Sequence, residues 1–122
     1  MRFMMIYKPA DVEGMEAGTP PTQEAMAQMG KFIGELAQSG VLLATDGLLA
    51  SSKGARVHLS DGKVTVTDGP FTETKELIAG FAIIQVPSKA AAIELAERFL
   101  KIAGDGESEI RQMYDMPAYP PK

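Results

Sequence analysis

The side chains most able to do acid–base chemistry lie between residues 68 and 76, which read Asp-Gly-Pro-Phe-Thr-Glu-Thr-Lys-Glu. Asp68, Glu73, Lys75 and Glu76 would form a cluster at the rim of a cleft, and we treat them as candidate catalytic residues. Paired carboxylates can transfer protons if burial or a like charge moves one pKa towards neutrality. The alternative is a tight corner held by local charge pairs, because Asp-Gly-Pro favours a turn.

A second set of polar residues interrupts apolar segments and provides candidate ligand-binding residues. Arg111 follows Ile110, and a guanidinium in such a position pairs with a carboxylate or receives an anionic ligand. The expected carboxylate partners are Glu109 across a dimer interface and Asp46. Tyr7 is either a ligand-binding residue, with its hydroxyl at the edge of the sheet interface, or a packing residue without a binding role.

The single histidine, His58, is predicted to lie on the polar face of a hairpin and not to act as a catalyst, since its neighbours at two-residue spacing, Arg56 and Ser60, include no carboxylate that could orient the imidazole. The absence of cysteine excludes a thiol nucleophile and a disulfide scaffold. One histidine also excludes a multi-histidine metal site within one chain. Because no phosphate loop or dinucleotide fingerprint is present, we expect neither a metal nor a cofactor.

The composition is that of an ordinary globular domain. Apolar residues make up 45% and charged residues 23% of the 122 residues, so 1–122 is expected to form a single domain. The net charge of −4 argues against nucleic-acid binding. No stretch approaches the about 20 apolar residues of a membrane span, and no secretory signal is recognisable. We expect a cytoplasmic protein without membrane contact.

The periodicity of apolar residues predicts an α+β protein. Gly and Pro mark a loop at 9–20, and a Pro-rich tail at 116–122 cannot continue a sheet. In the first helix the expected apolar stripe is Met26, Met29, Phe32, Ile33, Leu36 and Ala37. The expected elements are a strand at 3–7, a helix between Thr22 and Gly40, a strand at 41–44 that ends near 46–47, a hairpin of 55–60 and 63–67 around Asp61-Gly62, a strand at 77–86, a helix between Ser88 and Gly104 or Gly106, and a strand at 109–114.

This order contains two β-α-β halves, which predicts a ferredoxin-like antiparallel sheet with two helices on one face and an inserted β-hairpin. Two of its strands, 3–7 and 77–86, are apolar on both faces. A sheet with one wet face should alternate apolar and polar residues. We therefore expect a homodimer that forms through the sheet face opposite the helices. The alternative is that the hairpin or the 9–20 loop folds over this face.

Residues 68–76 resemble the Asp-Gly-Pro-Phe-Ala-Glu-Thr-Lys-Glu segment of the DGPF-domain proteins, which belong to the wider YciI-like family; Thr72 replaces the alanine. The resemblance extends to 40–48, 80–81 and 109–111 and so covers essentially the whole chain. It implies a dimeric α+β barrel that binds a small molecule in a cleft at the dimer interface, with or without enzymatic turnover. The alternative it implies is a non-catalytic protein-interaction or regulatory module associated with sigma-factor systems. The His–Asp pair proposed for YciI-like enzymes is not carried over, because the position of His58 does not fit it.

Overall fold

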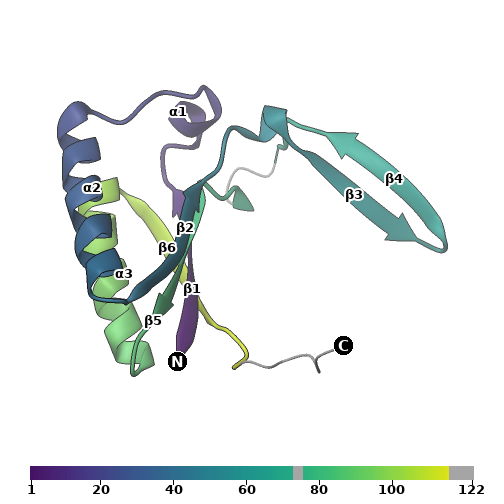
Figure 1. Ribbon diagram of the computed structural model, residues 1–122. Helices are drawn as coiled ribbons and strands as arrows, with labels where there is room; N and C mark the ends of the chain where they lie inside the picture. The colour runs from purple at the N-terminus through teal and green to yellow at the C-terminus, as the bar shows by residue number, and fades with distance from the viewer. Residues whose placement is uncertain (73–75, 116–122) are drawn as a thin grey trace.

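The structure is a computed structural model that describes residues 1–72 and 76–115 (Figure 1). Its elements in chain order are β1 (Arg2–Pro9), α1 (Val12–Glu16), α2 (Gln23–Gln38), β2 (Leu42–Gly47), the 3-10 helix η1 (Ser51–Lys53), β3 (Ala55–Ser60), β4 (Lys63–Asp68), β5 (Gly80–Gln85), α3 (Lys89–Ala103) and β6 (Gly106–Gln112).

Four strands form an antiparallel sheet in the order β2-β5-β1-β6, with β1 and β5 at its centre. Helices α2 and α3 lie side by side against one face of this sheet (Figure 1). This arrangement confirms the predicted ferredoxin-like α+β fold.

Local capping explains where the two long helices begin and end. The Thr22 hydroxyl accepts a hydrogen bond from the Ala25 N–H at 3.1 Å, and the Ser88 hydroxyl does the same for Ala91 at 3.1 Å. Gly40 adopts a left-handed φ of +80° directly after α2, the conformation that favours glycine at this position. Both predicted helices are therefore confirmed. Of the two glycines predicted to end the second helix, Gly104 is the C-cap residue that follows Ala103.

The core lies between the sheet and the helices, because alternate residues of β1 and β5 point towards α2 and α3. Two residues of the predicted helix stripe do not contribute: Met26 and Ala37 are exposed on α2. They lie at the margins of the stripe, beyond the reach of the narrow sheet. The buried core cluster consists of Phe3, Met5, Ile84, Val86, Ala92 and Ala96.

The structure corrects three of the predicted boundaries. The 9–20 loop contains the short helix α1, because the Asp11 side chain accepts a hydrogen bond from the Gly14 N–H. The strand predicted at 77–86 is confined to 80–85, and the buried Leu77 lies outside the ladder. β6 begins at Gly106, where a Cβ would lie 2.6 Å from the Lys8 carbonyl oxygen, so only glycine allows the strand to start there.

β3 and β4 form a separate two-stranded sheet, which we call the arm (residues 55–68). Asp61 and Gly62 both have positive φ, +50° and +77°, which confirms the predicted two-residue turn. Figure 1 shows the arm projecting away from the rest of the molecule. It therefore does not fold over the sheet face opposite the helices.

We call that sheet face the open face. Along each strand, the residues that point to the open face alternate with those that point to the core. Its central residues are Met4, Ile6, Phe81 and Ile83, and its peripheral residues are Lys8, Ala44, Asp46, Glu109 and Arg111.

Candidate functional site

A cleft of about 490 Å³ lies where α1, the segment 47–54, Phe71 and the segment 76–78 meet at the base of the arm. We call it the arm-base cleft. Its polar lining comes from the side chains of Glu16, Ser51, Lys53, Arg56 and Glu76. The apolar side chains that complete it are Met15, Leu48, Leu49, Ala50, Phe71, Leu77 and Ile78.

Glu16 and Ser51 form the most constrained polar contact in this cleft. The Ser51 backbone N–H donates to Glu16 Oε2 at 2.8 Å, and the Ser51 hydroxyl donates to Glu16 Oε1. The Ser51 oxygen in turn accepts a hydrogen bond from the Phe71 N–H at 3.0 Å. The two hydrogen bonds from Ser51 lower the pKa of the Glu16 carboxyl. The contact thus joins α1, η1 and the segment that follows Pro70, with Glu16 as a carboxylate.

The corner at residues 68–71 packs directly on η1. The Gly69 N–H donates to the Gly54 carbonyl at 3.0 Å. A Cβ on Gly69 would overlap the backbone carbonyl of Ser51, so this position requires glycine. The Phe71 ring lies under the guanidinium of Arg56, 3.9 Å from the ring centroid. These contacts give the conspicuous Asp-Gly-Pro-Phe motif a structural role, as one wall of the cleft.

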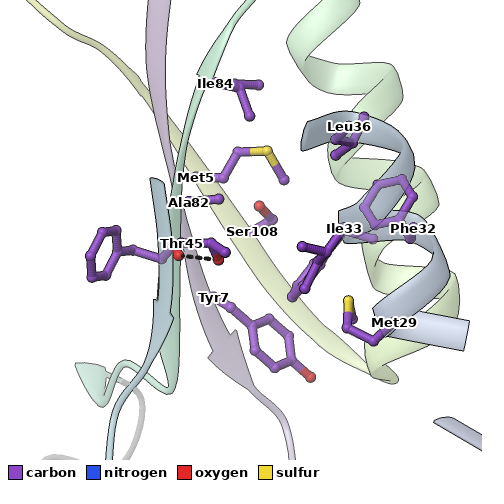
Figure 2. Close-up of a pocket in the computed structure, with 12 residues that line it drawn as sticks. Met5, Tyr7, Met29, Phe32, Ile33, Leu36, Thr45, Ala82, Ile84 and Ser108 are labelled. Atoms are coloured by element: carbon purple, nitrogen blue, oxygen red, sulfur yellow. Dashed lines mark hydrogen bonds between the residues drawn. The ribbon is translucent and has the colours of Figure 1, made fainter. Parts of the chain in front are cut away.

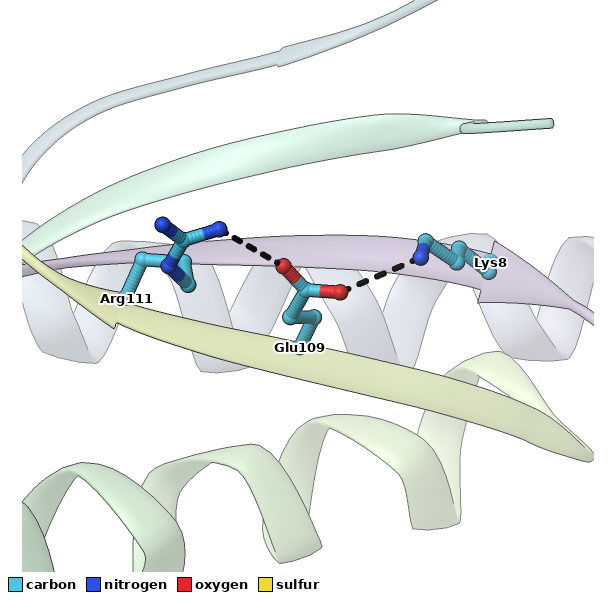
Figure 3. A network of polar contacts seen from close by, with 3 residues as sticks. All are labelled: Lys8, Glu109 and Arg111. Atoms are coloured by element: carbon cyan, nitrogen blue, oxygen red, sulfur yellow. Dashed lines mark hydrogen bonds and ion pairs between the residues drawn. The ribbon is translucent and has the colours of Figure 1, made fainter. Parts of the chain in front are cut away.

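A chain of charges crosses the open face next to this cleft (Figure 3). Lys8 Nζ lies 3.1 Å from Glu109 Oε1, and Arg111 lies 3.3 Å from Glu109 Oε2. The hydrogen bonds from Lys8 and from Arg111 both lower the pKa of Glu109, and the one from Lys8 has the larger effect. Glu109 raises the pKa of Lys8, and the carboxylate of Glu76 contributes to the same shift. The charge of Glu76, which lines the arm-base cleft, therefore acts on Lys8 of the open face.

The structure does not bring the predicted candidate residues together in one place. Of the four candidate catalytic residues, Glu76 lines the arm-base cleft and Asp68 ends β4 at the base of the arm. Glu73 and Lys75 lie outside the described residues. Glu76 is thus the candidate whose position in the cleft the structure describes.

The candidate ligand-binding residues also separate. Tyr7 lies on the face that carries the helices, where its ring packs edge-on against Phe99. Asp46 and Arg111 lie on the open face, but their strands β2 and β6 are the two edges of the sheet. Arg111 pairs with Glu109 two residues away in its own strand, and not with Glu109 across the dimer or with Asp46 as predicted, because the two side chains stand on the same face of β6.

Sequence reasoning missed Glu16 and Ser51. Glu16 falls in a segment that reads as a loop, and Ser51 lies 35 residues further along the chain. No spacing rule connects two such positions, and neither residue stands in a recognisable motif. Their contact exists because the loop after β1 and the connection after β2 end at the same edge of the fold.

Within residues 1–72 and 76–115, no three histidine, aspartate or glutamate side chains are grouped so that they could hold a metal ion. The helices of this part of the chain are also too short or too polar to cross a membrane.

Comparison with solved structures finds four matching chains, among them a relative that shares the fold. It is 5-chloro-2-hydroxyhydroquinone dehydrochlorinase (TftG) from Burkholderia phenoliruptrix AC1100, in complex with 2,5-dihydroxybenzoquinone. The two chains are 13% identical, the alignment covers 93% of this chain and 94% of that one, and the TM-score is 0.52. No curated protein sequence matches the chain.

The family model of the YCII-related domain matches residues 1–117, which is nearly the full length of the chain. This match agrees with the resemblance carried by the Asp-Gly-Pro-Phe segment. The chain therefore belongs to the family of YCII-related domain proteins.

Proposed function

We propose that this protein is a homodimer, paired through its open face, that binds a small organic molecule in the arm-base cleft. The observation that carries the proposal is the cleft itself, in which a mainly apolar lining surrounds a few fixed polar groups next to the open face. We also infer a single-domain organisation over residues 1–122 and a cytoplasmic location, both of which stay predictions from the sequence.

The open face supports pairing with a second copy. Met4, Ile6, Phe81 and Ile83 are only partly buried within one chain, although they occupy the centre of the sheet. Apolar side chains in such a patch gain free energy when a partner removes them from water.

The arm-base cleft supports ligand binding. Its volume lies within the about 300–1,000 Å³ typical of small-molecule sites. Its apolar walls suit the body of an organic molecule, while Lys53 and Glu76 offer a cation and a carboxylate to its polar groups. Both carboxylate oxygens of Glu16 accept hydrogen bonds from Ser51. Glu76 is therefore the carboxylate in the lining that could transfer a proton if binding is accompanied by turnover.

A direct test titrates the protein with 2,5-dihydroxybenzoquinone, chosen as a first probe because the structural relative was solved with it, and then with a panel of phenols and small carboxylic acids. We expect saturable heat of binding for at least one compound, with Lys53→Ala or Glu76→Gln weakening it severalfold. Lys63→Ala, at the far end of the arm, is the matched control. Binding that both cleft variants leave unchanged would refute the site.

Light scattering tests the dimer separately. A dimer should have twice the chain mass of 13.0 kDa, and Ile83→Lys on the open face should convert it to a monomer that still folds. A wild-type monomer at micromolar concentration would contradict the proposed pairing without affecting the ligand test.

One observation favours a second function, docking of another protein. The apolar face of the arm is exposed, with Val57 at 72%, Leu59 at 68%, Val64 at 64% and Val66 at 63% of their full accessible areas. Such a face is typical of an interaction surface. If docking is the function, Leu59→Ser should abolish capture of the partner, whereas Ser60→Ala on the opposite face should not.

A further inference from the structure

A second cavity, separate from the arm-base cleft, lies inside the molecule between the sheet and the helices (Figure 2). It has a volume of about 60 Å³ and shares no lining residue with the cleft. Met5 and Ser108 approach it from the sheet, and Met29, Phe32 and Ile33 approach it from α2. A molecule inside would therefore lie between the sheet and the two long helices.

Three hydroxyl groups line this cavity, and their hydrogen bonds differ. Thr45 donates to the Phe81 carbonyl at 2.9 Å. Tyr7 is directed to the carbonyls of Gly104 and Asp105, both at the long distance of 3.3 Å. The Ser108 hydroxyl is buried and has no hydrogen-bond partner among the described residues. Leaving a buried donor unpaired is unfavourable, so Ser108 has a donor available to a molecule in the cavity.

No charged side chain lines this cavity, since all twelve lining residues are neutral. An anion or cation placed there would lose its hydration without a compensating charge. The lining therefore selects neutral molecules, in contrast to the charged arm-base cleft.

The size of the cavity limits the ligand further. A dry apolar cavity of about 150 Å³ is known to hold benzene, so the present cavity accepts a ring only if its walls move. Met5 and Met29 can provide that movement, because methionine is unbranched and changes its shape at little energetic expense. A water molecule is the competing occupant: it needs about 2–4 polar partners, and the three hydroxyls that line the cavity are the side-chain groups that could supply them.

From these observations we propose that the cavity is a binding site for a small neutral molecule, no larger than a phenol, whose single oxygen accepts a hydrogen bond from Ser108. This proposal is independent of ligand binding in the arm-base cleft. It concerns a different set of residues, because the cavity and the cleft share no lining residue.

The test follows the methyl signals of the methionines by NMR during titrations with phenol, benzene and benzoate. Phenol should shift the Met5 and Met29 signals saturably, while the exposed Met26 serves as an internal control. Ser108→Ala should weaken phenol binding about fivefold, the loss expected for one hydrogen bond, and should leave benzene binding unchanged. Ser60→Ala is the matched control on the arm.

Variants that fill the cavity complete the test. Ile33→Phe enlarges a partly exposed helix residue, and Ala82→Leu enlarges a strand residue, so at least one should fold; either should abolish the phenol shifts. The proposal is overturned if phenol and benzene give no saturable shift, as expected if water alone occupies the cavity. It is also overturned if benzoate binds as tightly as phenol, or if Ser108→Ala weakens phenol and benzene equally.

Discussion

Ser51 donates both its backbone N–H and its hydroxyl to the carboxylate of Glu16, although the two residues lie 35 positions apart in the chain. Since the same serine oxygen accepts from the Phe71 N–H, three connecting segments depend on one side chain. The arm-base cleft is shaped by these segments, so its geometry depends on Ser51.

We expect Ser51→Ala to lower the free energy of unfolding by about 1–2 kcal/mol, because the Phe71 N–H loses its acceptor. Urea denaturation would measure the change, with the neighbouring exposed Ser52→Ala as control. Equal midpoints for the Ser51 variant and the wild type would show that the contact contributes nothing to stability.

Gly69→Ala should be more damaging than Ser51→Ala. A Cβ at this position would overlap the Ser51 backbone, and a backbone contact cannot be relieved by turning a side chain. Overpacking of this kind costs about 1–3 kcal/mol or more. Gly34→Ala is the matched control: nothing lies within 4 Å of its added Cβ, and in a helix interior it should stabilise by about 0.5–1 kcal/mol. A Gly69→Ala variant as stable as the wild type would contradict the proposed packing of the corner on η1.

The stability of the protein should depend on pH through Lys8 and Glu109. The pKa of Glu109 lies below its ordinary value of 4.5, so its contribution is complete above pH 4.5 and is lost as the pH falls through the lowered value. The pKa of Lys8 lies above 10.5, so its contribution is lost only as the pH rises through that raised value. Glu109→Gln should therefore reduce stability at pH 7 and have little effect at pH 2. Glu97→Gln, exposed on α3, is the control, and a Glu109 effect that is the same at both pH values would argue against the ion pairs.

His58→Gln should leave the free energy of unfolding within about 0.5 kcal/mol of the wild type. His58 is exposed on the polar face of the arm, opposite Thr65 and between Arg56 and Ser60. None of these three neighbours is a carboxylate that could orient an imidazole for catalysis. If turnover of a substrate is found, its pH profile should also be unchanged. A limb near pH 6–7 that disappears in the variant would show that His58 takes part in the reaction.

Much of the fold could be predicted because it depends on local chemistry. Thr22 and Ser88 mark helix starts through their own hydroxyls, and Asp61-Gly62 forms a turn that requires positive φ at both residues. The start of β6 could not be predicted, because the need for Gly106 arises from its approach to the Lys8 carbonyl in another strand.

The candidate site was harder to predict because it depends on contacts between elements that are distant in the chain. The segment 68–76 stands out in the sequence, and its residues Phe71 and Glu76 do line the arm-base cleft. Tyr7 and Arg111, by contrast, lie on opposite faces of the sheet. Which face a strand residue takes follows from alternation, but what covers that face depends on elements distant in the chain.

The arm leaves and rejoins the body of the protein at nearly the same point, since the Gly69 N–H contacts the Gly54 carbonyl at 3.0 Å. A segment with such closely spaced ends can change in length without moving the strands on either side of it. The arm is therefore a natural place to insert or exchange sequence: related chains with shorter, longer or absent hairpins could keep the same four-stranded body. A variant in which a two-residue turn replaces residues 56–67 should retain the helices and sheet while losing whatever the arm contacts.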